Sequence, residues 1–240
     1  MSLLQLSEVT LALYDGARRL TVLDGVSFEV GEGELAGIYG GRRSGKSTLL
    51  RVAAGLELPD SGTVHFGSTG LTSISASARA RLRRRGGIAL AGDRCSRPGV
   101  PEQVLEHVAL PLTNDGLTLR ESEGLARPVL QRLGLSAIAH LRVEALSASD
   151  AVLVELARSL AREPRLLLFD EPALLPSPSA RRELQGLLRQ LTRDDGIAVV
   201  VASEDVGCLA GVDRFLTLSG GRLRCTDSRR RVIPFPARAR

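Results

Sequence analysis

The chain has 240 residues, of which 43% are hydrophobic and 25% are charged, so it can bury a full core and has the composition of a globular protein. No apolar run approaches the ~18 residues that a membrane-spanning helix requires, and residues 1–5 lack the basic start of a signal peptide. We therefore expect a cytoplasmic protein whose role at a membrane, if it has one, depends on a partner.

The net charge of +5 is compatible with binding to nucleic acid or to an anionic membrane surface. Much of the excess lies in two arginine clusters, at 79–85 and 229–231, which solvated surface explains more simply. Nucleic acid is therefore not the favoured partner. Cys95, Cys208 and Cys225 are far apart and odd in number, so neither a disulfide framework nor a zinc site is predicted.

The first part of the chain predicts strands around a glycine-rich loop. Residues 3–13 and 20–30 alternate apolar and polar side chains, with Asp15-Gly16 as a turn between them, which is typical of antiparallel strands. A strand at 34–39 runs into the loop, and a helix at 46–55 follows it. The turn at 59–62 then leads to a strand at 63–66, a helix at 75–85 and a buried strand at 87–91.

The middle of the chain, from about 92 to 160, has helical periodicity at 102–110, 119–133 and 150–161 and few strand signals. Strands and helices then alternate again, with strands at 165–169, 197–202, 214–218 and 222–225 and a helix at 179–192. This order predicts an α/β fold, in which a mostly parallel sheet has helices on both faces and carries an inserted helical subdomain. We expect the basic tail, residues 227–240, to be flexible.

The glycine-rich loop matches G-x-x-x-x-G-K-[ST], the pattern of a phosphate loop between a strand and a helix. Its residues are Gly40, Gly41, Arg42, Arg43, Ser44, Gly45, Lys46, Ser47 and Thr48. Backbone N–H groups at the start of the helix would surround phosphate oxygens, Lys46 would reach the β- and γ-phosphates, and the Ser47 hydroxyl would coordinate Mg²⁺. Lys46 is the one lysine among 32 basic residues, which indicates that arginine cannot replace it there.

An apolar strand ending in Asp170-Glu171 supplies the second half of such a site. Asp170 could hold magnesium through water beside Ser47, and Glu171 could polarise an attacking water. Taken alone, an acidic pair before Pro172 also fits an ordinary exit from a strand. The phosphate loop upstream favours the catalytic interpretation.

Over residues 3 to about 226 the chain resembles the ATP-binding subunits of ABC transporters. Besides the two nucleotide motifs, the resemblance rests on the segments 49–56, 59–62, 104–112 and 156–164. The run Glu106 to Leu112 looks most like the lipoprotein-releasing, macrolide-exporter and cell-division branch. The resemblance implies a phosphate-loop nucleoside triphosphatase core, ATP and Mg²⁺ as cofactors, and an adenine-stacking role for Tyr14, for which an ordinary tyrosine at a strand end is the less favoured alternative.

The same resemblance implies a dimer in which each subunit contributes a phosphate loop to one site and a signature motif to the other. Where the family has Leu-Ser-Gly-Gly-Gln, this chain has Leu146, Ser147, Ala148, Ser149 and Asp150. Two glycines that let backbone approach phosphate are replaced, and the carboxylate of Asp150 would repel the phosphates.

Four other family positions also depart. The family glutamine is absent from Gly92-Asp93-Arg94, and the loop after the acidic pair reads Leu174-Leu175-Pro176-Ser177. Glu204 takes the place of the switch histidine. Arg43 stands where the family usually has glycine, at a position that can require a positive φ.

Two functions remain open on this basis. The first is a subunit that binds Mg-ATP and drives a separate membrane permease from the inner face of the cell membrane, paired with a second ATPase chain, although a homodimer is possible. The second is a pseudo-ATPase that binds nucleotide as a structural or regulatory element. The altered motifs leave open whether the chain hydrolyses ATP on its own. A nucleic-acid-associated ATPase is a weaker third possibility.

Overall fold

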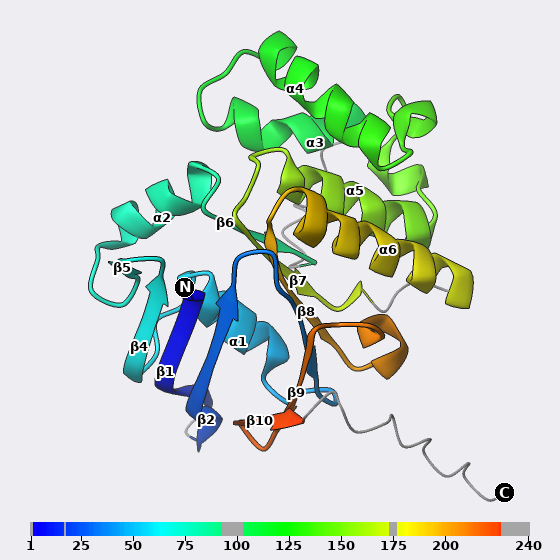
Figure 1. The fold of residues 1–240 in the computed structure, drawn as a ribbon. Helices are drawn as coiled ribbons and strands as arrows, with labels where there is room; N and C mark the ends of the chain where they lie inside the picture. The colour runs from blue at the N-terminus through cyan, green and yellow to red at the C-terminus, as the bar shows by residue number, and fades with distance from the viewer. Residues whose placement is uncertain (1, 17, 93–102, 173–176, 227–240) are drawn as a thin grey trace, which may run out of the picture.

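The structure is a computed structural model that describes residues 2–16, 18–92, 103–172 and 177–226 (Figure 1). The expectations for Asp93, Arg94, Cys95, Leu174, Leu175, Pro176 and the tail from residue 227 lie outside the described residues. No helix in the described part of the chain is long and apolar enough to cross a membrane.

A small antiparallel sheet forms one side of the molecule, with strand order β2-β1-β4-β5. Its strands are β1 (Ser2–Asp15), β2 (Arg18–Gly31), β4 (Ser61–Phe66) and β5 (Thr69–Gly70). The long hairpin predicted around Asp15-Gly16 is confirmed, because β1 and β2 pair along nearly their whole length. The two-residue strand β5 was not predicted, since so short a segment has no periodicity.

The larger sheet has six strands in the order β10-β9-β3-β8-β7-β6, and all neighbours except β9 and β10 are parallel. Its strands are β3 (Leu35–Tyr39), β6 (Ile88–Ala91), β7 (Leu166–Asp170), β8 (Ala198–Ser203), β9 (Arg214–Ser219) and β10 (Arg222–Thr226). The predicted α/β class with a mostly parallel sheet is confirmed.

Each buried strand divides its side chains between two cores. In β8, Val200 points into the cluster shared with α1 (Lys46–Ala53) and the small sheet, whereas Val199 and Val201 point into the cluster shared with the helices between residues 104 and 194. In β7, Leu168 and Phe169 divide in the same way. Burial on both faces explains why these strands read as continuous apolar runs.

Helices cover both faces of the six-stranded sheet. They are α1 (Lys46–Ala53), α2 (Ala76–Arg84), α3 (Val104–Thr113), α4 (Leu119–Arg132), α5 (Ala148–Leu160) and α6 (Pro178–Asp194), with short 3-10 turns η1 (Ser136–Ile138), η2 (Val143–Ala145) and η4 (Val206–Leu209). In Figure 1, α3 and α4 lie above α5, and α5 and α6 run along the large sheet. Helix α1 ends at Ala53 rather than at residue 55, and Gly55, with φ 63°, follows beyond its C-cap.

Candidate functional site

The phosphate loop lies between β3 and α1, where the carboxyl ends of the parallel strands meet. Strand β3 lies between β8 and β9, and β7 is the next strand beyond β8. The backbone N–H of Gly40 donates to the carbonyl oxygen of Ser203 at the end of β8, at 3.2 Å. The sheet therefore brings the loop and the segments that follow β7 and β8 to one edge, where open α/β sheets bind their ligands.

Glycines give the loop its shape. Gly45 has φ 100°, and a side chain there would stand 2.9 Å from the carbonyl oxygen of Val22 in β2. A side chain at Gly40 would overlap the hydroxyl of Ser44. Arg43 has φ 60°, so the expected left-handed position is confirmed, and a non-glycine residue there costs on the order of 1 kcal/mol.

Lys46 is buried, with 6% of its surface exposed, and its ammonium group is fully used. Its Nζ donates to the carbonyl oxygens of Gly40 at 2.8 Å and Gly41 at 3.1 Å. It also forms an ion pair with Oε1 of Glu171 at 2.9 Å. An ammonium has three N–H donors, and these three partners engage all of them.

Glu171 is held in place from three sides. Its backbone has φ 45°, and its N–H donates to the carbonyl oxygen of Ala202 at 2.9 Å. Its second carboxylate oxygen, Oε2, accepts from the backbone N–H of Glu204 at 3.3 Å. Glu204 thus contacts the acidic pair through its backbone, while its side chain is exposed. A left-handed glutamate that is kept at a strand end is a feature found at functional sites.

The remaining groups around the loop suit a magnesium-bound nucleotide. Asp170 is buried at the end of β7, and the Ser47 side chain is exposed in the first turn of α1. Their oxygens are the hard ligands that Mg²⁺ prefers. The first N–H groups of α1 have no partner within the helix, and the space beside Gly41 is open. An anionic phosphate chain with its metal fits this donor set.

Tyr14 lies at the end of β1, near the tip of the hairpin that it forms with β2. Its ring is 74% exposed. Strand β2 of the same hairpin approaches the loop through Val22, beside Gly45. The ring is therefore available for stacking on a base, and that role stays a prediction.

Residues 146–150 form the start of α5, in a different part of the fold from the phosphate loop. Ser147 is the N-cap, and its Oγ accepts from the backbone N–H of Asp150 at 3.1 Å. The same Oγ donates to Oδ2 of Asp150 at 2.6 Å. The hydroxyl is thus engaged within its own helix, and the carboxylate occupies the positive end of the helix dipole.

The segment after Glu204 is fastened to α6. Arg181 forms an ion pair with Asp205 at 3.1 Å, and Gln185 donates to the carbonyl oxygen of Gly207.

Burial, followed by the nearby charge of Asp205, raises the pKa of the Cys208 thiol. This thiol is thus poorly suited to act as a nucleophile.

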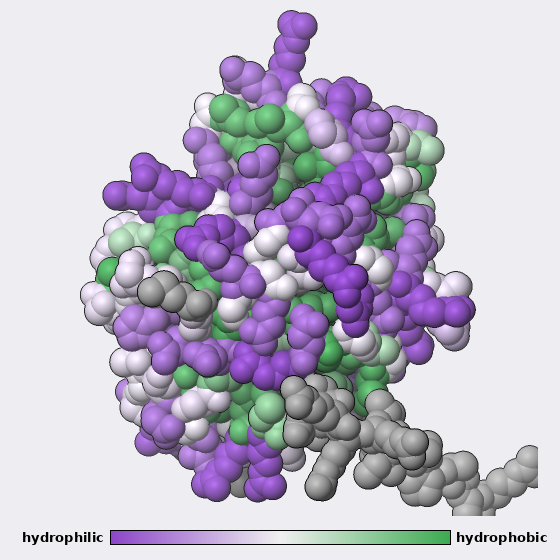
Figure 2. Space-filling view, in the orientation of Figure 1, coloured by the Kyte–Doolittle hydropathy of each residue, from purple (hydrophilic) through white to green (hydrophobic). Residues whose placement is uncertain are grey.

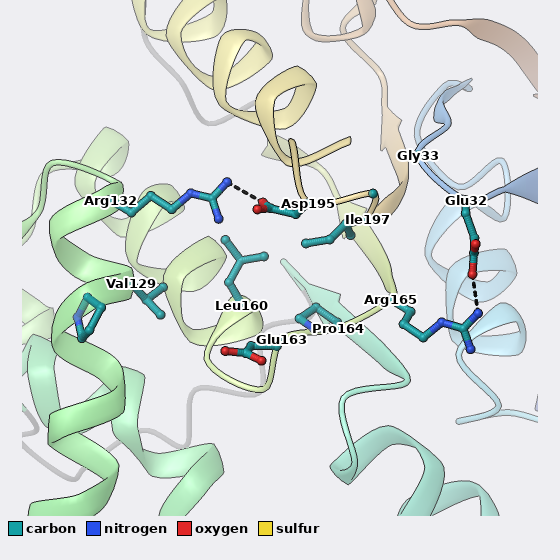
Figure 3. Close-up of a pocket in the computed structure, with 12 residues that line it drawn as sticks. Glu32, Gly33, Val129, Arg132, Leu160, Glu163, Pro164, Arg165, Asp195 and Ile197 are labelled. Atoms are coloured by element: carbon teal, nitrogen blue, oxygen red, sulfur yellow. Dashed lines mark hydrogen bonds and ion pairs between the residues drawn. The ribbon is translucent and has the colours of Figure 1, made fainter. Parts of the chain in front are cut away.

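A cavity of about 740 Å³ lies at the opposite end of the sheet (Figure 3). Arg165 and Ile197, which precede β7 and β8, line it, together with the ion pairs Arg132–Asp195 and Arg165–Glu32. Because Asp170 is at the other end of β7, this cavity is not part of the phosphate-loop site.

The sequence did not single out Ser203 or Gly92 as site residues, and it gave Glu204 a different role, as the replacement of the switch histidine. The carbonyl oxygen of Ser203 anchors the start of the loop, and the N–H of Glu204 holds Glu171. Gly92, which has φ 83°, lies so close to Asp170 that a side chain would overlap the aspartate's carbonyl oxygen. Ser203 and Glu204 act through backbone atoms, and Gly92 fits beside Asp170 because it has no side chain. Their side-chain chemistry therefore carries no signal for these roles.

Comparison with known proteins shows extensive similarity. Residues 23–174 match the family model described as ABC transporter. The chain is 35% identical to the lipoprotein-releasing system ATP-binding protein LolD of Cereibacter sphaeroides over 206 residues, which cover 85% of this chain and 90% of the relative. It is 34% identical to the methionine import ATP-binding protein MetN of Rhizobium johnstonii, over 90% of this chain and 60% of that protein.

Solved structures show the same architecture. A bacterial ABC transporter cassette solved as a dimer superposes with a TM-score of 0.83 at 26% identity, covering 92% of this chain and 96% of the cassette. The same cassette in a post-hydrolysis state, bound to ADP and phosphate, gives a TM-score of 0.84, again at 26% identity. The alignment with that structure covers 93% of this chain and 97% of the cassette.

Proposed function

The chain belongs to the ABC transporter family, as a nucleotide-binding subunit of the lipoprotein-releasing branch that works with a membrane permease, and from this premise we propose that it binds Mg-ATP around Lys46 and hydrolyses it with Glu171. The observation that carries the proposal is the 2.9 Å ion pair between Lys46 and Glu171. It joins the phosphate loop to the acidic strand end, although the two are far apart in the sequence.

Each residue of the site has a separate task in this proposal. The unpaired backbone N–H groups of the loop and the start of α1, together with the ammonium of Lys46, bind the phosphates, and Ser47 and Asp170 would hold magnesium. Magnesium held there would supply positive charge that stabilises the negative charge of the phosphate oxygens. Glu171 accepts a proton from the attacking water. Tyr14 stacks on the adenine.

The ATP-binding domain comprises residues 1–226 in this proposal, with a helical subdomain at about 92–160. Helices α3, α4 and α5 support this division, because each contacts the other two, and their hydrophobic cluster then continues into α6 and the large sheet. The basic tail, 227–240, lies beyond the domain. The subunit docks on its permease at the inner face of the cell membrane.

We propose that a second ATPase chain completes the dimer. The hydroxyl of Ser147 is bound by Asp150, and the carboxylate of Asp150 disfavours phosphate at the start of α5. A homodimer would contain two α5 N-termini that both disfavour phosphate. A heterodimer would place the nucleotide of this chain against an intact signature motif of its partner.

Two measurements test nucleotide binding and hydrolysis. Lys46→Ala should abolish binding of a fluorescent ATP analogue, because no other side chain replaces the buried ammonium. Glu171→Gln should abolish single-turnover hydrolysis of radiolabelled ATP while binding persists. Robust turnover by Glu171→Gln would contradict the role of Glu171.

Purification of the tagged chain from membranes tests the partners. We expect a permease and a second ATPase chain to be recovered with it. Recovery of the permease with this chain as its sole ATPase would overturn the heterodimer.

A pseudo-ATPase is the second candidate function, favoured by the closed Ser147–Asp150 cap and by Glu204 in place of the switch histidine. It predicts nucleotide binding without turnover, even in the complete membrane complex. Hydrolysis in that complex at rates typical of transporters would exclude it.

A further inference from the structure

The ammonium of Lys46 is not free to meet a ligand in this structure. Its three donors contact the carbonyl oxygens of Gly40 and Gly41 and the carboxylate of Glu171. The ion pair with Glu171 also compensates its charge. A phosphate must therefore replace at least one of these partners before it can contact Lys46.

Two other cations in the same loop have no such partner. Arg42 and Arg43 are exposed, and neither guanidinium forms a hydrogen bond or ion pair with the residues that the structure describes. Some arginines elsewhere in the described chain are used structurally: Arg79 donates to the carbonyl oxygen of Ile74, and Arg83 to that of Gly55. The two loop arginines thus add positive charge beside the start of α1 that the neighbouring described side chains leave uncompensated.

Their position is also maintained against a backbone cost. Arg43 has φ 60°, a conformation that glycine adopts freely and a side chain does not. Adjacent guanidinium groups also repel each other until an anion lies between them. Binding of a phosphate chain would relieve this repulsion.

We propose that Arg42 and Arg43 are specificity-determining residues, whose guanidinium groups bind the terminal phosphate and make the loop favour nucleoside triphosphates over diphosphates. This inference rests on the proposed function, because it requires a nucleotide in the loop. A triphosphate carries one more negative charge than a diphosphate, and a guanidinium fork can hold two phosphate oxygens at once. The arginines thereby offset the loss of the Lys46–Glu171 pair more strongly for a triphosphate.

The test compares the dissociation constants of fluorescent ATP and ADP analogues, measured at equilibrium in EDTA so that no metal contributes. The wild type should bind the ATP analogue more tightly. Arg43→Asn and the double variant Arg42→Asn/Arg43→Asn should lower the ratio of the ADP to the ATP dissociation constant by about ten-fold, the effect of one charge-assisted hydrogen bond. Asparagine tolerates the left-handed backbone, so the change isolates the charge.

Two control variants separate local charge from other effects. Arg43→Lys keeps the positive charge and should retain most of the ratio. Arg81→Asn removes an exposed charge from α2 and should leave the ratio unchanged. Raising the salt concentration should reduce the preference of the wild type, because the arginines are exposed.

An unchanged ratio in the double variant, with both analogues still bound, would overturn the role of the arginines. A similar loss of preference in Arg81→Asn would also overturn it, since net charge alone would then be responsible. Failure of the wild type to bind either analogue would instead contradict the proposed nucleotide site itself.

Discussion

Lys46 and Glu171 neutralise each other in this structure, so a nucleotide bound as we propose would compete with a carboxylate for the same ammonium. The pair is partly shielded, because Lys46 is 6% exposed and the Glu171 side chain 35%. Because the carboxylate of Glu171 is partly exposed to water, the ion pair stabilises the structure only moderately, near the range of surface ion pairs. Binding of nucleotide and release of Glu171 are then linked events.

From this competition we predict that Glu171→Gln raises the affinity for nucleotide. A glutamine can still accept a hydrogen bond from Lys46 but carries no charge, so the ammonium is released more readily. We expect about a five-fold lower dissociation constant for a fluorescent ADP analogue in EDTA, equivalent to ~1 kcal/mol. Glu204→Gln is the matched control, because Glu204 contacts Glu171 through its backbone. Equal affinities for Glu171→Gln and the wild type would contradict the competition.

Gly92 is a second residue whose environment makes a sharp prediction. A methyl group at this position would overlap the carbonyl oxygen of Asp170, so Gly92→Ala must displace the end of β7 or its own segment. We expect a loss of at least about 2 kcal/mol in the free energy of unfolding. Urea unfolding followed by circular dichroism measures it.

Gly134 supplies the control for Gly92. It has φ 72° against 83° for Gly92, but nothing lies within 4 Å of an added methyl group. Gly134→Ala should therefore show only the backbone cost of about 1 kcal/mol. Equal losses for the two variants would show that Gly92 has no special relation to Asp170.

At the scale of elements, α4 begins with a complete capping box. Oγ1 of Thr118 accepts from the N–H of Glu121 at 3.3 Å, and Oε2 of Glu121 accepts from the N–H of Thr118 at 2.9 Å and from its hydroxyl at 2.7 Å. These reciprocal bonds satisfy donors that the helix itself leaves unpaired. They explain why α4 begins at Leu119, as its periodicity predicted.

We predict that Thr118→Ala destabilises the protein by about 1 kcal/mol, the usual effect of losing an N-cap hydroxyl. The midpoint of urea unfolding measures this loss. Ser73→Ala serves as a control, because the Ser73 hydroxyl bonds to a turn carbonyl, that of Gly70, and caps no helix.

The effect of Thr118→Ala should also depend on pH. Hydrogen bonds from the hydroxyl and then the backbone N–H of Thr118 lower the pKa of Glu121 below its ordinary value of 4.5. A pKa that is lower in the folded chain stabilises the fold fully above the unfolded value, and this stabilisation is lost as the pH falls through the folded value. The difference between wild type and variant should thus shrink below pH 4.5. A constant difference would show that Glu121 takes no part.

At the scale of the whole molecule, polar side chains cover much of the face drawn in Figure 2, and apolar side chains fill the two cores on either side of the large sheet. In the proposed assembly the chain binds its own nucleotide at one sheet edge and presents the start of α5 to a second site. Its capacity to complete a second site depends on the start of α5, where Ser147 and Asp150 bond to each other.

We predict that restoring the family motif enables ATP-dependent self-association. The starting variant is Glu171→Gln, which should retain ATP. Three further substitutions remove the carboxylate and free the Ser147 hydroxyl at the start of α5: Ala148→Gly, Ser149→Gly and Asp150→Gln. Light scattering after size exclusion should then detect a dimer with ATP. Glu171→Gln alone should remain monomeric. A dimer of Glu171→Gln alone would contradict the proposed need for a second ATPase chain.

The sequence alone determined the phosphate loop, the acidic pair and the type of nearly every element, because residue spacing and side-chain periodicity are local properties. Through the resemblance, it also marked Arg43 as a position that can require a positive φ, which the structure confirms. The short strand β5 and the end of α1 were missed or misplaced by a few residues, since local patterns define boundaries weakly.

The tertiary structure decided which groups meet. The strand order places β8 beside β3 and β7 next beyond β8, so that Glu171 contacts Lys46 and the carbonyl oxygen of Ser203 anchors the loop. The tertiary structure also shows that the Ser147 hydroxyl is hydrogen-bonded to the Asp150 carboxylate. These contacts depend on backbone atoms and on residues distant in the chain, and neither is encoded in a local pattern of side chains.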